Sequence, residues 1–158
     1  MGFQTKLNGD LPQAVAGDFA STNPYHTLLS GEGSFKAGTN GVNVGTFAWV
    51  DKTNGTVQNV AIAGARFGFV GRMNIGVATE YLGESSMKIN KGLGVTLYDG
   101  GDFWAVFKDG AVIGEKVYAL NAYGTVVSSS KDVAGATDTG FIVQSKADAG
   151  GVAKISKF

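Results

Sequence analysis

The stretch Val95–Gly110, VTLYDGGDFWAVFKDG, contains two short apolar runs separated by an acidic tetrad with glycine at its centre. In the tetrad, Asp99–Asp102, the central Gly-Gly accepts the positive φ angles that tight hairpin turns require. We therefore predict a β-hairpin whose strands are Val95–Tyr98 and Phe103–Phe107.

Similar apolar runs recur along most of the chain, and glycine marks the breaks between them. The 25 glycines are roughly twice the usual share of about 7%. This spacing predicts an all-β fold, an antiparallel β-sandwich, jelly-roll-like, or a partly open barrel, of about ten short strands. The spacing within 74–82 also allows one or two helical turns. The other expected strands are Tyr25–Leu29, Gly41–Asp51, Thr56–Ala63, Ala65–Arg72, Asn74–Leu82, Ser85–Asn90, Glu115–Leu120, Gly124–Ser128, Gly140–Ser145 and Val152–Phe158.

Residues 1–33 differ from the rest of the chain because they are polar, contain both prolines and show no clean period. We predict an extended N-terminal arm over residues 1–33 and a β domain over residues 34–158. A disordered terminus is the alternative, but the arm carries many apolar side chains for a solvated tail. We expect these side chains to dock on this domain or on a neighbouring chain. They are Phe3, Leu7, Val15, Phe19, Tyr25, Leu28 and Leu29.

Charge and cysteine content exclude several classes of protein. The 13 basic and 13 acidic residues cancel, and no basic block forms the positive footprint of a nucleic-acid-binding protein. Charged residues make up only 16%, against about 25% in ordinary soluble domains, which indicates that another chain covers part of the surface. The absence of cysteine excludes disulfides, thiolate zinc sites and a cysteine nucleophile. The sequence shows no signal peptide and no membrane-spanning run, so we expect no Sec-type export and no membrane partner.

Two expected strands, residues 42–50 and 103–107, are apolar on both faces. A small antiparallel sheet normally exposes one face to water. Apolar side chains on both faces therefore predict either a fully covered central strand or a subunit interface. The opposing faces are Val42, Val44, Ala48 and Val50 against Phe47 and Trp49, and Phe103, Ala105 and Phe107 against Trp104 and Val106.

Acidic residues beside a tryptophan are a candidate Ca²⁺ or sugar site, and here they are Asp99, Asp102 and Trp104. Calcium takes six or more oxygen ligands, and two carboxylates supply too few, so the turn is the preferred interpretation. His26 is the only histidine, and its surroundings do not resemble a nucleophile elbow. We expect no catalytic residue, no metal and no cofactor. An enzyme built from scattered carboxylates or His26 is the weakest hypothesis.

Five segments of the sequence, taken in this order along the chain, resemble the structural cement proteins (head decoration proteins) of tailed bacteriophages. They are AVAGDFASTNP, AGTNGVNVGTFAWVD, GFVGR, GVTLYDGGDFWA and GEKVYALNAYGTVV, with a weaker echo in GFIVQSKADAGGVAKISKF. The resemblance implies a small all-β protein without catalytic residues. Such a protein binds the outside of the capsid where subunits of the major capsid protein meet, often as a symmetric oligomer.

On this resemblance we expect a virion protein that cements the outer surface of a tailed-phage capsid and is made in the host cytoplasm. Its expected partners are the major capsid protein and itself, as a homodimer or homotrimer. The alternative is a carbohydrate-binding β-sandwich module that stacks sugars on Trp49 or Trp104. The candidate residues for capsid or subunit contact are Phe3, Asp18, Phe19, Asn23, Pro24, Tyr25, Phe47, Trp49 and Trp104.

Overall fold

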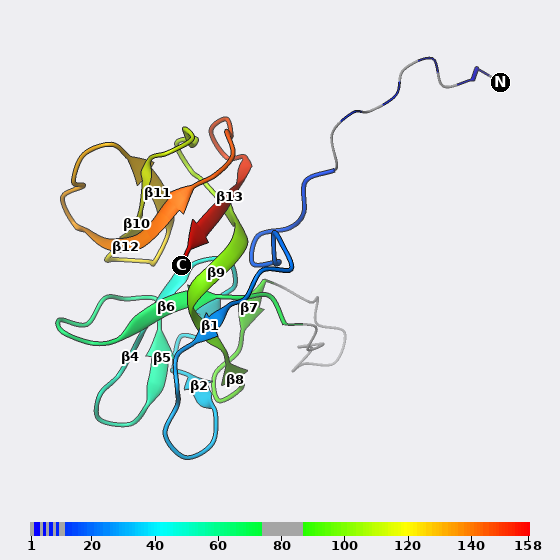
Figure 1. Ribbon diagram of the computed structural model, residues 1–158. Helices are drawn as coiled ribbons and strands as arrows, with labels where there is room; N and C mark the ends of the chain where they lie inside the picture. The colour runs from blue at the N-terminus through cyan, green and yellow to red at the C-terminus, as the bar shows by residue number, and fades with distance from the viewer. Residues whose placement is uncertain (1, 4, 6, 8, 10–11, 74–86) are drawn as a thin grey trace.

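The computed structural model describes residues 2–3, 5, 7, 9, 12–73 and 87–158, and within them the chain forms strands and turns but no helix (Figure 1). Accordingly, these residues contain no helix with the length and apolar character needed to span a membrane. In chain order the strands are β1 (His26–Thr27), β2 (Phe35–Ala37), β3 (Val42–Asn43), β4 (Phe47–Val50), β5 (Thr56–Gln58), β6 (Phe67–Val70), β7 (Lys88–Ile89), β8 (Gly94–Val95), β9 (Leu97–Val106), β10 (Lys116–Leu120), β11 (Val126–Ser129), β12 (Ala136–Val143) and β13 (Val152–Lys157).

Most of these strands belong to one sheet, in the order β11-β10-β12-β13-β9-β6-β4-β5-β2-β8, with β1 paired to β9. β3 and β7 form a separate two-stranded ribbon. Pairing is antiparallel except between β2 and β5. Among the described strands the two ends of the order, β11 and β8, do not pair with each other, so the sheet does not close into a barrel. Figure 1 shows β10–β13 above β2, β4–β6 and β8, and we call these two groups the upper and lower half-sheets.

The stretch predicted to be a hairpin is a single strand. β9 runs through the tetrad from Leu97 to Val106, so the predicted reversal at Asp99–Asp102 is wrong. Leu97 and Tyr98 pair with β6 in the lower half-sheet, whereas residues 101–106 pair with β13 in the upper one. The two apolar runs have different partners, and β9 is the strand that joins the two half-sheets.

The two central glycines of β9 are explained by close approach and by backbone conformation, without a turn. Gly101 has φ +127°, and a Cβ there would lie 2.8 Å from the Cβ of Tyr25. A Cβ at Gly100 would lie 3.1 Å from the carbonyl oxygen of Lys157. Glycine meets both conditions at the lowest cost. The residues that suggested a reversal therefore allow one strand to change partners.

β4 accounts for one of the two strands that are apolar on both faces, because all four of its residues are buried. Phe47 and Trp49 pack in a core cluster that spans both half-sheets and includes Phe103 and Phe141. Ala48 and Val50 pack in a second cluster that lies in the lower half-sheet and its neighbouring ribbon. Of the two alternatives stated for this strand, the fully covered central strand is the one observed, and the arrangement is sandwich-like.

The other strand predictions are confirmed where the structure describes them, with shorter or shifted bounds. β10 pairs with β11, and β12 pairs with β13, as the two expected hairpins. The expected strand Gly41–Asp51 is interrupted, because Gly45 has φ +74° and turns the chain between β3 and β4. The expected strand Asn74–Leu82 lies outside the described residues, as does the start of Ser85–Asn90, which ends in β7. The arm boundary at residue 33 stays a prediction.

The substitution Gly101→Ala tests the role of β9. Both the positive φ angle and the proximity of Tyr25 oppose a side chain here, so we expect the variant to lose about 2 kcal/mol of unfolding free energy. Urea denaturation measures the loss. Gly31→Ala is the matched control, because an added Cβ meets nothing within 4 Å there. Equal midpoints for the two variants would contradict the assignment.

Candidate functional site

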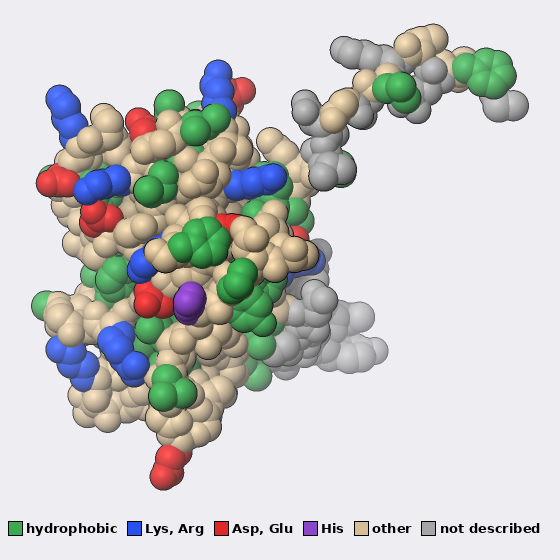
Figure 2. Space-filling view, in the orientation of Figure 1, with side chains coloured by type: hydrophobic (Ala, Val, Ile, Leu, Met, Phe, Trp, Pro, Cys, Tyr) green, Lys and Arg blue, Asp and Glu red, His purple; other side chains and the backbone are tan. Residues whose placement is uncertain are grey.

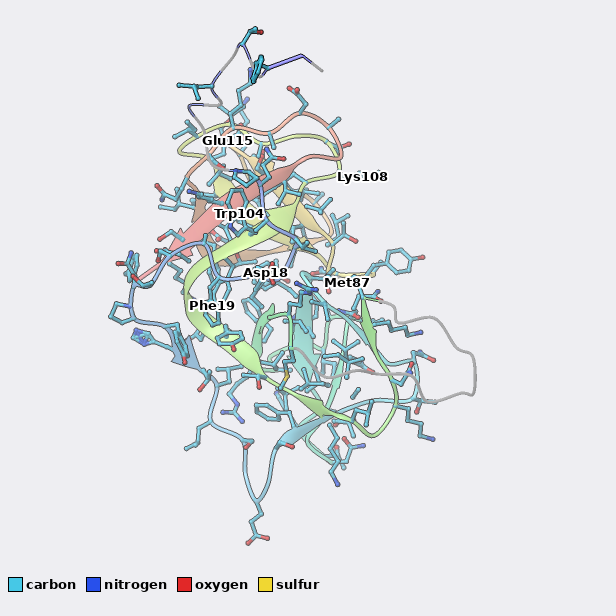
Figure 3. All side chains as sticks on the ribbon, turned by 90° about the vertical axis from the view of Figure 1, so that its right-hand side faces the viewer. Asp18, Phe19, Met87, Trp104, Lys108 and Glu115 are labelled. Carbon is cyan, nitrogen blue, oxygen red and sulfur yellow. The ribbon has the colours of Figure 1, made fainter. Side chains whose placement is uncertain are left out.

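Residues 17–28 run along the edge of β9 that β6 and β13 leave free, and we call them the edge segment. The N–H of Gly17 donates to the carbonyl of Trp104 at 2.8 Å, and the N–H of Trp104 donates to the carbonyl of Asp18 at 2.9 Å. Further along, β1 pairs with the first half of β9. Figure 3 shows Asp18, Phe19 and Trp104 close together along this strand. The backbone groups of β9 are therefore paired on both sides, and the edge segment adds a strand-like layer to the sheet.

The edge segment and β9 contain the same tripeptide, and the two copies of it lie side by side. Gly17–Phe19 and Gly101–Phe103 both read Gly-Asp-Phe. Phe19 and Phe103 form an antiparallel bridge, with ring centroids 5.1 Å apart. Both glycines have positive φ angles. The two segments that pair here therefore share the tripeptide and the positive φ angle of its glycine.

The Asp102 carboxylate of β9 holds the part of the edge segment that contains Ser21 and Asn23. Asp102 accepts hydrogen bonds from the Ser21 hydroxyl at 2.5 Å and from the Asn23 side-chain amide at 2.7 Å. Burial alone raises the pKa of Asp102, but hydrogen bonds from Ser156, Ser21 and Asn23 and the charge of Lys154 outweigh it, so the pKa is lowered. The ionised carboxylate therefore stabilises the loop.

The start of the edge segment is fixed by its backbone more than by its charges. The N–H of Arg72 donates to the carbonyl of Gly17 at 2.8 Å. The Arg72 guanidinium also pairs with the Asp18 carboxylate at 3.3 Å, but both side chains are partly exposed. An exposed ion pair contributes less than about 1 kcal/mol. The buried Gly17 has φ +91°, and a Cβ there would lie 2.7 Å from Cγ1 of Val44. Gly17 is thus the fixed point from which residues 1–16 depart.

Four aromatic rings pack together where the edge segment crosses β9. Phe19 lies 4.9 Å from Tyr25, 5.4 Å from Tyr98 and 5.1 Å from Phe103, measured between ring centroids. Burial raises the pKa of Tyr98, and the neighbouring Tyr25 raises it further. Phe103 is fully buried, whereas Phe19 is 44% and Tyr25 55% exposed. We call Phe19 and Tyr25 the aromatic ridge; Figure 2 shows hydrophobic side chains gathered beside the single histidine on this face.

Large rings that are exposed and yet fixed from beneath are characteristic of protein contact surfaces, where aromatic residues are enriched. The structure brings together five of the predicted contact residues in the edge segment, and Trp104 lies beside them on β9 with the Lys154 ammonium 5.1 Å from its ring centroid. Phe47 and Trp49 are 0% and 2% exposed, so their side chains are core and do not reach the surface. Phe3 is 93% exposed and belongs to the N-terminal tail, outside the edge segment. The five residues are Asp18, Phe19, Asn23, Pro24 and Tyr25.

Ser21, Arg72 and Tyr98 help to hold this surface in place, and no pattern in the sequence predicts that role for them. The Asp102 carboxylate was considered as a metal or sugar ligand, and in the structure it binds the edge segment. The Asp99 carboxylate accepts a bond from Lys157 at 2.8 Å. In the described part of the chain, no group of three or more His, Asp or Glu side chains is placed to hold a metal ion.

Comparison with known proteins gives a family model and solved structures that match this chain. A family model described as XM1 gp53 minor capsid protein matches residues 3–157. A chain in a solved structure of the capsid of Myoviridae phage XM1 has a TM-score of 0.60 and 20% identity, over 99% of this chain and 97% of its own length. At that identity the structural likeness shows the fold alone. No curated protein matches by sequence.

Asp102→Asn tests the hydrogen bonds that hold the edge segment. The lowered pKa means that the carboxylate stabilises the fold above the unfolded-state value of about 3.9, and that this contribution is lost as pH falls through the lower folded-state value. We expect the variant to be about 1 kcal/mol less stable at pH 7. The difference from the original protein should shrink towards zero as the pH falls through the lowered folded-state pKa of Asp102.

Urea denaturation at several pH values measures the effect, and Asp109→Asn, at an exposed position outside this cluster, is the control. A gap between Asp102→Asn and the original protein that stays constant from pH 7 to acid would contradict the role of the ionised carboxylate.

Proposed function

Since this chain belongs to the XM1 gp53 minor capsid protein family, and so is a structural component of the virion, we propose that it cements the outer surface of a tailed-phage capsid. Its partner in this proposal is the major capsid protein, which it contacts where capsid subunits meet. The protein is made in the host cytoplasm and attaches to the exterior of the shell. The resemblance of five of its sequence segments to head decoration proteins supports a location on the capsid exterior.

The aromatic ridge is the observation that carries the proposal. Phe19 and Tyr25 are exposed, but Phe103 and Tyr98 support them from below and the backbone bonds of β9 hold their segment in register. Such rings lose little conformational entropy on binding, because their positions are set before the partner arrives. The ridge is therefore suited to bind a protein groove, and in this proposal the groove belongs to the capsid.

The low charge of the chain supports a role that depends on buried surface. Charged residues are 16% of the sequence. A standard protein interface buries on the order of 1,200–2,000 Å² without requiring any active site. A copy that contacts two capsid subunits at once also gains from multivalency, because its first contact raises the effective concentration of its second. Modest individual contacts are then sufficient to stabilise a shell.

The carbohydrate-binding alternative has less support, because one of its two stacking platforms is absent from the surface. Trp49 is 2% exposed and packs against Phe67 at 5.8 Å between ring centroids. Trp104 is partly exposed, but the Lys154 ammonium lies over its ring. No coplanar pair of exposed tryptophans is available for a sugar.

Tyr25→Ser tests the proposal on purified expanded heads of the matching phage that lack this protein. Removing an exposed ring should weaken binding about tenfold or more if the ridge is a contact centre. Tyr123→Ser is the matched control, because Tyr123 is 70% exposed in the turn between β10 and β11, away from the ridge. Binding is measured by co-sedimentation, and electron cryomicroscopy locates the bound protein.

Equal binding by the two tyrosine variants would remove the ridge from the contact. A failure of the original protein to attach to the outside of these heads would end the cement proposal itself.

A further inference from the structure

We propose that copies of this protein exchange their N-terminal tails, so that residues 1–13 of one copy dock in an apolar groove between the half-sheets of another. This contact is made between copies of the chain, does not involve the aromatic ridge and does not require a capsid.

The groove lies where the edge segment begins. It has a volume of about 730 Å³ and, apart from Lys108, only uncharged residues line it. The turn between β3 and β4 (residues 44–46) and Met87 line one part of it, and residues of β9, β11 and β13 line another. Figure 3 labels Met87 and Lys108, two of the lining residues. Its main apolar side chains are Val15, Val44, Met87, Val106, Val126 and Val152.

Within the part of the chain that the structure describes, the groove is only partly covered. Val15, Val106 and Met87 are 47%, 41% and 40% exposed, although all three are apolar and line the same hollow. Val106 belongs to the strand that is apolar on both faces, and burial within the chain accounts for only one of those faces. An occupant that covers these side chains gains roughly 25 cal/mol for each Å² of apolar surface removed from water.

The N-terminal tail has the length and the pattern to be that occupant. Phe3, Leu7 and Leu11 recur every fourth residue, so in an extended chain they point to the same side. Phe3 and Leu7 are 93% and 89% exposed, and the tail leads away from the body (Figure 1). Thirteen extended residues reach about 43 Å, which is enough to cross a neighbouring domain of this size.

The place where the tail starts favours a second copy as the source of the occupant. Ala14, Val15 and Ala16 themselves line the groove, so each tail leaves from the rim of one groove. Two copies related by a rotation, with their grooves facing, can each place a tail in the other's groove, which is a closed and self-complementary exchange.

Two variants test the contribution of the tail and that of the groove separately. Phe3→Ser combined with Leu7→Ser removes the apolar tail, and Val106→Lys places a charge in the groove at a position that is already partly exposed. We expect each variant alone to self-associate at least about a hundredfold more weakly than the original protein. Analytical ultracentrifugation measures the association, and Ile113→Lys, 64% exposed and not a lining residue, is the control. Unfolding midpoints establish that every variant is folded.

Mixing the two variants gives the decisive result. The tail variant keeps an intact groove, and the groove variant keeps an intact tail. An equimolar mixture should therefore form a heterodimer in which one tail docks in one groove, although each variant alone is monomeric. A cross-link from residue 3 to the groove should then join two chains.

A monomeric original protein, self-association that survives the loss of the tail side chains, or a cross-link within one chain would each overturn the exchange. If the protein is monomeric in solution and still attaches to heads, the tail exchange is overturned and the cement proposal stands. Conversely, tail exchange by a protein that ignores heads would contradict only the cement proposal.

Discussion

The structure depends on one long strand that keeps its backbone hydrogen bonds on both edges while its neighbours change. β9 pairs with β6 at its start and with β13 beyond residue 100, and the edge segment covers its other side. A buried backbone N–H or C=O without a partner is costly, so a strand at the centre of a sheet must be paired throughout. Gly100 and Gly101 permit the close approach and the unusual φ angle at the point of change.

The same constraint creates the aromatic surface. Because β9 needs a partner on its free edge, the N-terminal part of the chain is held in a fixed register, and Phe19 is placed over Phe103. Phe103 belongs to the core that joins the half-sheets, so the exposed ring rests on a fully buried side chain. Stability and presentation of the surface therefore come from a single set of contacts.

The molecule has two apolar surfaces of different character. The aromatic ridge stands on the edge segment with its rings supported from below, and it is suited to enter a recess of a partner. The groove between the half-sheets is a recess itself, lined by short aliphatic side chains, and it is suited to receive an extended chain. The proposed cement role requires at least two contacts, and these two surfaces have no residue in common.

Local sequence pattern was sufficient for the fold class and for most strands, including β10 with β11 and β12 with β13, where short turns leave adjacent segments little choice of partner. It also identified the edge segment as unusual and named five of its residues as contact candidates. The tetrad Asp99–Asp102 was misread, because Gly-Gly permits a turn and equally permits a strand to approach its neighbours closely.

Periodicity states which side chains are apolar on a face, but not what covers that face. It marked both 42–50 and 103–107 as apolar on both faces; only tertiary structure buried Phe47 and Trp49 completely and left Val106 in an open groove. Strand pairing uses backbone groups that are alike in every residue except proline, so the choice between distant partners comes from how the side chains pack together in three dimensions. By itself, then, the sequence determined the all-β class, most of the strands and the absence of cysteine chemistry. Tertiary packing decided that β9 joins two half-sheets and that residues 17–28 lie along its edge.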